Sequence, residues 1–317
     1  MQPLAIVIPA YKARFLTATL QSIAAQTSRR FVVYVGDDAS PEDLAAVCRP
    51  WAEQLELRYH RFDQNLGGRD LVGQWQRCIG LGTEPWVWLF SDDDVMSPTC
   101  AERLLQAAEA EGDRQALFHF NVDRIGAQGQ LLRVEPEFPA LLSTRAFALG
   151  RLRFELSSYA PDYAFRRSRF LECGGFQAFP LAWCSDDATW IKLAAERGIR
   201  TLAAAKIGWR RSGDNISSRH THDSALKVQA LASYLRWLDA HLQAHPAARG
   251  EPGDDEILGC FARWFSMQIY WMQHHFSLPA AWRQVGQFSG VRGMGALQTL
   301  GAIGRSRMRS WREPVVI

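Results

Sequence analysis

The first part of the chain alternates between short apolar segments and segments with helical periodicity. The apolar segments lie at 4–8, 31–35, 57–60 and 85–90, and the helical patterns that follow them lie at 16–26, 44–55, 71–81 and 101–110. A strand that is apolar at consecutive positions is buried on both faces, which is typical of a parallel sheet between two layers of helices. The pattern therefore predicts an α/β fold with a mostly parallel central sheet.

The regular alternation ends after an apolar segment at 117–121. Turn signals follow at 126–129 and near two prolines, Pro136 and Pro139, and a further helix is expected at 187–197. The pattern is mainly helical from about residue 218 to 275, and a segment rich in Gly and Arg follows it. We therefore predict an α/β domain at 1–220, with halves at about 1–115 and 116–220, and a helical extension at 221–317.

The composition is that of a globular protein, with 47% hydrophobic and 22% charged residues. The net charge is +3, and most of the basic residues are arginines. They are scattered along the sequence up to a cluster near its end, at Arg305, Arg307, Arg309 and Arg312. A nucleic-acid binder concentrates its basic residues on one element, so we expect no nucleic-acid partner. The late cluster instead makes the C-terminal region a candidate for peripheral membrane contact.

The sequence also bears on the compartment. The six cysteines show none of the spacings of a metal site, which predicts reduced, packed thiols. The N-terminus lacks the pattern of a signal peptide, and no window reaches the roughly 18 apolar residues of a membrane span. We therefore expect a cytoplasmic protein.

Polar residues follow each of the first four predicted strands, at the edge where ligands bind in parallel α/β sheets. They are Pro9-Ala10-Tyr11, Asp37-Asp38, Asn65 to Gly68, and Asp92-Asp93-Asp94. Three consecutive carboxylates repel one another unless water or a cation neutralises them. Mg²⁺ or Mn²⁺, held by one or two carboxylates and phosphate oxygens, suits a nucleotide diphosphate at this edge. The alternative is a solvated acidic turn that caps the next helix.

The other strand-end residues have two interpretations each. Asp38 can accept a hydrogen bond from a nucleobase N–H, or it can belong to a helix cap and turn. Tyr11 can stack on a base, or pack as an ordinary core or rim residue. Asn65 and Gly67 can allow the backbone to approach a ligand closely, or form a simple glycine loop.

A second acidic pair, Asp186-Asp187, opens the helix expected at 187–197. The pair is either a helix cap or a catalytic feature in which Asp187 removes a proton from an acceptor hydroxyl. Downstream, Arg210 belongs to a segment at 209–217 that we expect to be a loop, either closing over a diphosphate or lying at the surface. His220 and His222 are weak candidates for a further metal ligand.

In order along the chain, these segments resemble glycosyltransferase family 2, a group of enzymes with the GT-A fold, over about residues 3–220. The similar segments are Ile6–Tyr11, Gln21–Thr27, Val35–Ser40, Asn65-Leu66-Gly67, Ser91–Asp94, Gly174-Gly175-Phe176 and Asp186-Asp187. The sequence departs from the family pattern at three places. At 91–94 it has Ser-Asp-Asp-Asp where the family has Asp-x-Asp-Asp, and at 186–187 it has Asp-Asp where Glu-Asp is common. The Arg-Asn that usually follows Asn-x-Gly is replaced by the segment 71–75.

The resemblance implies a Rossmann-like GT-A domain with a donor side and an acceptor side. The implied donor-binding residues are Pro9, Ala10, Tyr11, Asp38, Asn65, Gly67 and Asp92, the last facing the ribose. The implied metal ligand is Asp93, with Asp94 as the alternative principal ligand. Asp187 would be the base, and the acceptor side would include Gly175, Phe176 and Asp186, with Arg210 on the loop.

We therefore expect a metal-dependent, inverting glycosyltransferase of the hexosyltransferase type, with UDP as the family's usual donor nucleotide. The acceptor would be a saccharide or a lipid-linked saccharide, as in the assembly of bacterial surface polysaccharide or glycolipid. Two alternatives are a non-catalytic nucleotide- or carbohydrate-binding protein on the same fold, and a phosphohydrolase. A phosphohydrolase is the weaker one, because its acidic run usually follows the first strand and here it follows the fourth.

Overall fold

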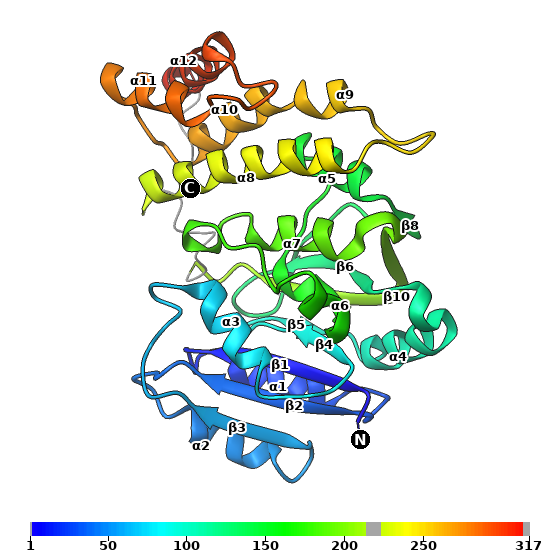
Figure 1. Cartoon of the computed structure of the whole chain (residues 1–317). Coiled ribbons are helices and arrows are strands. Elements are labelled where there is room, and N and C mark those ends of the chain that lie inside the picture. Colours follow the sequence, from blue (N-terminus) through cyan, green and yellow to red (C-terminus); the bar gives the residue numbers. More distant parts are fainter. Residues whose placement is uncertain (1, 214–222, 313–317) are drawn as a thin grey trace. The chain divides into compact units, whose positions relative to one another are not determined.

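The computed structural model describes residues 2–213 and 223–312, which form two compact units (Figure 1). The described residues of the first unit come from Met1–Thr144, Leu156–Gln177 and Thr189–Ser212. Those of the second unit come from Arg145–Glu155, Ala178–Ala188 and Gly213–Ile317. Both units are therefore assembled from segments that are discontinuous in the sequence.

The first unit is built around a mixed β-sheet. Its strands are β1 (Leu4–Ala10), β2 (Phe31–Asp37), β3 (Leu57–Arg61), β4 (Trp86–Leu89), β5 (Val95–Met96), β6 (Leu117–Ile125), β7 (Leu131–Val134), β8 (Leu141–Leu142), β9 (Tyr163–Arg166) and β10 (Ile199–Arg210). Their order is β3-β2-β1-β4-β9-β6-β10-β5, with β7 beside β6 and β8 beside β10. Strands β3, β2, β1 and β4 are parallel, and so are β6 and β10, whereas β9 is antiparallel to both of its neighbours.

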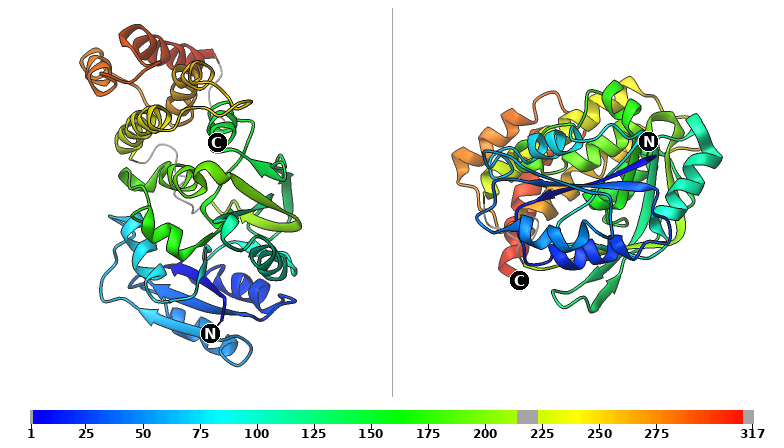
Figure 2. Two further views of the ribbon diagram at one scale, coloured as in Figure 1. Left: turned by 45° about the vertical axis from the view of Figure 1, so that its right-hand side comes forward. Right: turned by 90° about the horizontal axis from the view of Figure 1, so that it is seen from below.

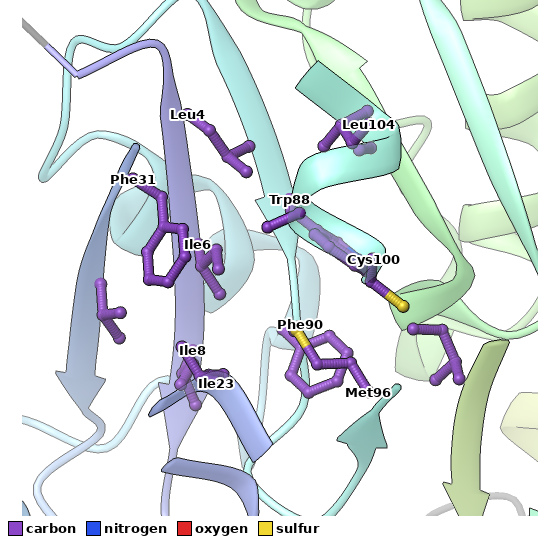
Figure 3. Packing of buried hydrophobic residues seen from close by; sticks show 14 of the residues in the cluster. Leu4, Ile6, Ile8, Ile23, Phe31, Trp88, Phe90, Met96, Cys100 and Leu104 are labelled. Carbon is purple, nitrogen blue, oxygen red and sulfur yellow. The ribbon is translucent and has the colours of Figure 1, made fainter. Parts of the chain in front are cut away.

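Helices cover both faces of the parallel part of the sheet. On one face, apolar side chains of β1, β2 and β4 pack against α1 (Leu16–Ala24), α2 (Leu44–Cys48) and α4 (Cys100–Glu111), as Figure 3 shows for part of this core. Helix α3 (Leu71–Ile79) lies on the opposite face (Figure 2). There Cys78 comes so close to Gly36 that a Cβ at Gly36 would lie 2.4 Å from the sulfur. The predicted α/β fold class is thus confirmed.

One predicted helix is shorter than its apolar pattern. The pattern at 44–55 predicts a single helix, but α2 ends at Cys48 and a 3-10 turn follows over Arg49–Trp51. Pro50 explains the change, because proline has no N–H to donate and its ring clashes with the carbonyl four residues earlier in an α-helix.

The second half of the sheet is where sequence and structure differ most. The turn expected at 126–129 is present, and it joins β6 to β7 in a hairpin. The prediction of a loop at 209–217 is wrong for its first two residues. Trp209 and Arg210 complete β10 and pair with Arg124 and Ile125 of β6. The later part of that loop, and both His220 and His222, lie outside the described residues.

The remaining short helices are α5 (Thr144–Leu152), α6 (Arg167–Glu172) and α7 (Ser185–Ala194). Helix α7 confirms the helix expected at 187–197, with a 3-10 turn at Ala195–Arg197 continuing it. Helix α6 belongs to the first unit, whereas α5 and α7 each contribute residues to both units.

The second unit is helical. Its further helices are α8 (Ser224–Ala244), α9 (Asp254–Leu258), α10 (Phe261–Trp271), α11 (Leu278–Gln287) and α12 (Ala296–Arg312). Helical structure continues beyond 275 into the segment rich in Gly and Arg, within the range 221–317 where the sequence predicts a mainly helical extension. Ser277 caps α11 and a proline follows in its first turn, while α12 packs against α10. Within residues 2–213 and 223–312, no helix is both long and apolar enough to cross a lipid bilayer.

Candidate active site

Asp92 connects the carboxyl ends of β4 and β1. Its Oδ2 accepts hydrogen bonds from the backbone N–H groups of Tyr11 at 2.9 Å and Lys12 at 3.1 Å. The end of β2 joins them, because the N–H of Asp38 donates to the carbonyl of Ala10 at 2.9 Å. The predicted meeting of strand ends is therefore confirmed, and the Tyr11 side chain is exposed at this edge.

Asp94 ties the acidic segment to β10. Its Oδ1 accepts a hydrogen bond from the backbone N–H of Arg210 at 2.7 Å, and its carbonyl accepts one from Thr19 Oγ1 at 2.8 Å. The Arg210 guanidinium donates to the carbonyls of Asp93 at 2.6 Å, Gly126 at 3.0 Å and Ala127 at 3.1 Å. These contacts correct the expectation that Arg210 is a loop residue that either closes over a diphosphate or lies at the surface. It is buried, and it holds the backbone of the acidic segment in place.

Burial and mutual repulsion make the three carboxylates difficult to ionise together. Burial raises the pKa of Asp92. Burial and then the neighbouring Asp92 raise the pKa of Asp93 to about 7, and burial and Asp93 raise the pKa of Asp94 well above its usual value. A nearby cation favours the charged form of a carboxyl group. The electrostatics of this segment therefore favour a bound cation.

The donor atoms fit a hard divalent cation. Asp94 Oδ2 is buried, and no hydrogen-bond partner for it exists among residues 2–213 and 223–312. The same part of the chain contains no group of three His, Cys, Asp or Glu side chains arranged to hold a metal. A cation at Asp93 and Asp94 would therefore complete its coordination with water or phosphate oxygens, which is how Mg²⁺ is commonly bound.

The alternative of a solvated, helix-capping acidic turn does not describe this segment. Helix α4 begins at Cys100, and Thr99 occupies its N-cap position. Asp94 is fully buried, and a short strand, β5, separates it from the helix. The acidic run is therefore part of the sheet edge.

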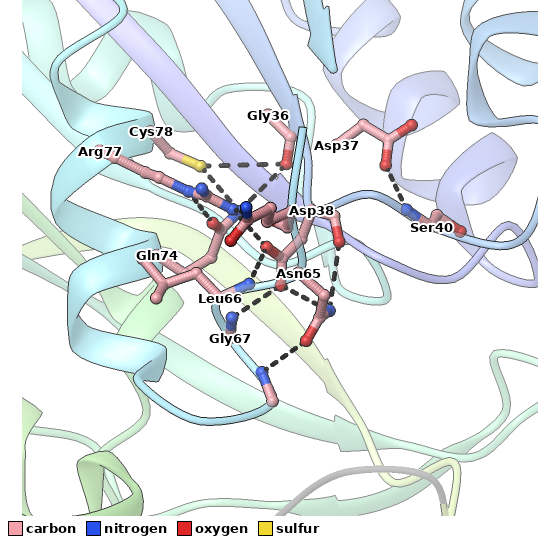
Figure 4. A network of polar contacts seen from close by, with 12 residues as sticks. Gly36, Asp37, Asp38, Ser40, Asn65, Leu66, Gly67, Gln74, Arg77 and Cys78 are labelled. Atoms are coloured by element: carbon pink, nitrogen blue, oxygen red, sulfur yellow. Dashed lines mark hydrogen bonds and ion pairs between the residues drawn. The ribbon is translucent and has the colours of Figure 1, made fainter. Parts of the chain in front are cut away.

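The Asp38 carboxylate organises the loop that follows β3 (Figure 4). Its Oδ1 accepts hydrogen bonds from the N–H of Leu66 at 2.7 Å and from the Arg77 guanidinium. Its Oδ2 accepts from Asn65 Nδ2 at 2.9 Å and from the N–H of Gly67 at 2.8 Å. These donors use the four acceptor positions of a carboxylate. The expectation that Asp38 directly accepts a bond from a nucleobase is thus corrected: Asp38 shapes the loop.

Gly67 is explained by this network. A Cβ at position 67 would lie 2.8 Å from Asp38 Oδ2, which is closer than a carbon atom can approach an oxygen held by two hydrogen bonds. The close backbone approach expected at Asn65 and Gly67 is therefore an approach to Asp38.

Asp37 supports the Tyr11 turn through a second network. It accepts hydrogen bonds from the N–H of Ser40 at 2.7 Å, from Arg61 Nη1 at 2.7 Å, and from the Tyr59 hydroxyl. Burial and then Asp37 raise the pKa of Tyr59 to about 12, so its hydroxyl stays a donor. Ser40 Oγ in turn donates to the carbonyl of Tyr11 at 2.6 Å. Both acids after β2 thus position the loops around the site.

The Gly174-Gly175-Phe176 turn is a structural element of the first unit. Both glycines have positive φ, at 74° and 75°, which L-residues with side chains rarely adopt. Phe176 is buried and packs against Phe165, Phe170 and Trp190. Phe176, which the family resemblance places on the acceptor side, is thus a buried packing residue of this turn.

Asp186 and Asp187 lie in the first turn of α7, within the second unit. Asp187 is buried, and its Oδ2 and Oδ1 accept hydrogen bonds from Arg151 Nε at 2.9 and 3.1 Å. Burial and then Asp187 raise the pKa of Asp186 to about 7. Burial and then Asp187 also raise the pKa of Tyr234, a buried residue of α8. The acidic pair thus lies in a buried, polar environment.

Arg77, Arg151 and Tyr234 are the residues that the sequence did not indicate. Arg77 bonds to Asp38, and its guanidinium lies 3.8 Å from the centre of the Phe62 ring. It comes from α3, whose first residues depart from the family pattern. No motif surrounds the other two residues, so only their contacts identify them.

Comparisons with known proteins bear on the family and the fold. The model of the family "Glycosyl transferase family 2" matches residues 5–173. An uncharacterised glycosyltransferase of Haemophilus influenzae is 26% identical over 175 residues, which are 54% of this chain and 55% of that relative. The chain thus spans about half the length of this curated relative.

Solved structures with a similar fold include TarS and a mannosyltransferase. S. aureus TarS 1-349, in complex with UDP-GlcNAc, has a TM-score of 0.57 at 12% identity, over 98% of this chain and 91% of that one. The mannosyltransferase PcManGT of Pyrobaculum calidifontis, in complex with GDP-Man and Mn²⁺, has a TM-score of 0.55 at 14% identity, over 99% and 88% of the two chains. The family model covers more than half of the 317 residues, so the chain belongs to glycosyl transferase family 2 and has the GT-A fold.

Proposed function

We propose that this protein is an inverting glycosyltransferase that moves a sugar from a nucleotide-diphosphate donor to an acceptor hydroxyl. The observation that carries the proposal is the acidic edge, where Asp92 joins two strand ends and Asp94 retains a buried oxygen without a partner among the described residues. A diphosphate and its cation satisfy the electrostatic requirement of such an edge. The donor nucleotide would stack on the exposed Tyr11 side chain, with Pro9 and Ala10 at the end of β1 beside it.

The proposed reaction is a single displacement at the anomeric carbon. Asp187 accepts the proton of the acceptor hydroxyl while that oxygen forms its bond to the sugar, and the bond from the sugar to the diphosphate breaks. One displacement inverts the configuration of the anomeric carbon. Arg151 holds the Asp187 carboxylate in one orientation through Nε. Mn²⁺ or Mg²⁺ bound at Asp93 and Asp94 would neutralise charge on the departing nucleotide.

We propose UDP as the donor nucleotide and Mn²⁺ or Mg²⁺ as the cofactor. The fold neighbours support a nucleotide-sugar donor, because one contains UDP-GlcNAc and the other GDP-Man with Mn²⁺. We further propose a saccharide or lipid-linked saccharide as acceptor, in bacterial surface polysaccharide or glycolipid assembly. A lipid-linked acceptor would place a cytoplasmic protein at the inner face of the cell membrane, with the C-terminal region in contact with it.

The proposal is tested by incubating the full chain with UDP- and GDP-sugars and Mn²⁺, and measuring release of the nucleoside diphosphate with and without saccharide acceptors. We expect release from one donor class, prevented by EDTA. Asp187→Asn should lower kcat by about 10²- to 10⁴-fold while donor binding is unchanged, because a general base contributes a factor of this size. Normal turnover by that variant would show that Asp187 is not the base.

The matched control is Asp255→Asn, an acid in the first turn of another helix of the second unit. Its kcat should equal that of the wild type. If none of the donors is bound or cleaved under any metal condition, the proposed function is wrong as a whole.

A further inference from the structure

The charged residues of the C-terminal segment are all positive. Residues 257–312 contain seven arginines, at 263, 283, 292, 305, 307, 309 and 312, and no Asp, Glu or Lys. Because the whole chain has a net charge of +3, the other residues together carry a net charge of −4. The positive charge of the protein is therefore concentrated in this segment of the second unit.

The same segment exposes large apolar side chains. In α11, Leu278 is 79% exposed and Trp282, one helical turn later, is 62% exposed. In α12, Leu297 is 85% exposed and Met308 is 53% exposed. At 100° per residue, positions 297 and 308 differ by only about 20° around the helix, so both side chains leave α12 on the same side.

The arginines of α12 flank this apolar side. On the same helical projection, Arg305 lies on one side of the line from Leu297 to Met308, and Arg307 lies on the other. Both arginines are exposed. The opposite face of α12 is buried through Thr299, Ala302 and Ser306. An apolar stripe between cationic flanks is typical of a helix that lies in the interface of a bilayer.

A recess connects the two helices. A cavity of about 180 Å³ is lined by Leu278 and Ala281 of α11 and by Leu300, Ile303 and Arg307 of α12, among others. Helices α11 and α12 are neighbours in this unit (Figure 1). Leu278 and Arg307 therefore border the same recess, with apolar walls and a guanidinium close together.

We propose that the face of α11 and α12 defined by Leu278, Trp282, Leu297, Met308, Arg283 and Arg305 docks on an anionic phospholipid bilayer. The apolar side chains enter the acyl boundary, and the arginines contact lipid phosphates, which attract basic residues at a membrane surface. The recess beside Leu278 accommodates an apolar part of a lipid, with Arg307 near its phosphate. The proposal adds a defined surface to the proposed function and requires none of its chemistry.

The test is co-sedimentation of the full chain, without donor, with two kinds of vesicle. One contains phosphatidylcholine only, and the other contains about one third phosphatidylglycerol, which supplies the anionic surface. We expect binding to the anionic vesicles only, weakened by high salt. Arg283→Gln with Arg305→Gln, and separately Leu278→Ser with Trp282→Ser, should each reduce binding at least about tenfold.

The matched control combines Arg103→Gln with Leu171→Ser, an exposed arginine and an exposed leucine of the first unit, and it should bind like the wild type. A second readout uses brominated lipid, which should quench tryptophan fluorescence in the wild type more than in Trp282→Phe. The proposal is overturned if the wild type ignores anionic vesicles, if it binds neutral ones equally, or if both double variants bind as well as the control. Because no donor is present, these outcomes do not depend on whether sugar transfer occurs.

Discussion

The Asp94 carboxylate accepts a hydrogen bond at 2.7 Å from the backbone N–H of Arg210, a residue 116 positions later in the sequence. The Arg210 side chain in turn donates a hydrogen bond from Nε to the carbonyl of Asp93. These two bonds attach the acidic edge to the end of β10, so the position of the carboxylates depends on a strand from the other half of the sheet. The acidic edge is therefore set by long-range contacts.

Arg210→Lys should impair this attachment. One ammonium group cannot reproduce the planar fork that reaches the carbonyls of Asp93, Gly126 and Ala127. We expect a loss of about 1–3 kcal/mol in the free energy of unfolding, measured by urea titration, because buried acceptors lose their partners. Arg211→Lys, an exposed neighbour, is the control and should be neutral. Wild-type stability for Arg210→Lys would contradict this role.

Gly67→Ala should disturb the Asp38 network. The added Cβ would lie 2.8 Å from Asp38 Oδ2, and the loop must move to relieve the clash. We expect about 1–3 kcal/mol of destabilisation, the usual result of inserting an atom into a packed site, together with weaker nucleotide binding by calorimetry. Gly286→Ala is the control, because among residues 2–213 and 223–312 its new Cβ meets no atom within 4 Å apart from those of adjoining residues and its own helix backbone. If Gly67→Ala binds and unfolds like Gly286→Ala, the network is not rigid.

Arg151 should act through Asp187. Arg151→Gln removes the charge and the Nε donor that hold the carboxylate, and Arg151→Lys keeps a charged donor but loses the planar guanidinium that places it. We expect kcat to fall about tenfold or more for Gln and less for Lys, since a misplaced catalytic group is less effective, with the donor KM nearly unchanged. Arg153→Lys, in an exposed ion pair with Glu256, should change neither constant. Equal loss of kcat in both Arg151 variants, with a raised KM, would indicate a structural defect instead.

His119 should make stability depend on pH. It is buried against Phe138 at a ring distance of 3.9 Å, and burial lowers its pKa to about 3. Between pH 3 and about 6.5, the unfolded chain binds a proton that the folded protein excludes, so His119 destabilises the fold increasingly as the pH falls. The wild type should therefore lose up to about 1.4 kcal/mol per pH unit more than His119→Phe.

That difference is measured by denaturant unfolding of both proteins at pH 4, 5, 6 and 7. Phenylalanine preserves the ring contact and cannot titrate, while every carboxyl group contributes to both curves. If the free energies of unfolding of the two proteins change in parallel across this pH range, His119 is protonated in the folded state.

The parallel half of the sheet was predictable because its signals are local. Consecutive apolar residues at 4–8 and 31–35 reveal buried strands, and the polar residues after them follow from the rule for strand ends. The contact between Asp92 and the Tyr11 turn confirms that inference. Resemblance to the family adds the expected roles.

The rest could not be predicted because it depends on contacts between distant segments. Asp38 looks like a base-reading or capping residue until Arg77 and the N–H groups of Leu66 and Gly67 are placed around it. Arg210 looks like a loop residue until β10 pairs with β6. Phe176 follows two glycines in a turn, and only its aromatic neighbours show that it is buried.

We propose that the acidic edge binds a nucleotide diphosphate together with a divalent cation. The test is calorimetric titration of UDP into three proteins, each with Mn²⁺ or with EDTA. The proteins are the wild type, Asp93→Asn and the exposed control Asp113→Asn. In the wild type and the control, we expect Mn²⁺ to tighten UDP binding about 10- to 100-fold. In Asp93→Asn, we expect Mn²⁺ to change UDP binding little. If UDP binds all three proteins equally with and without Mn²⁺, the claim is contradicted.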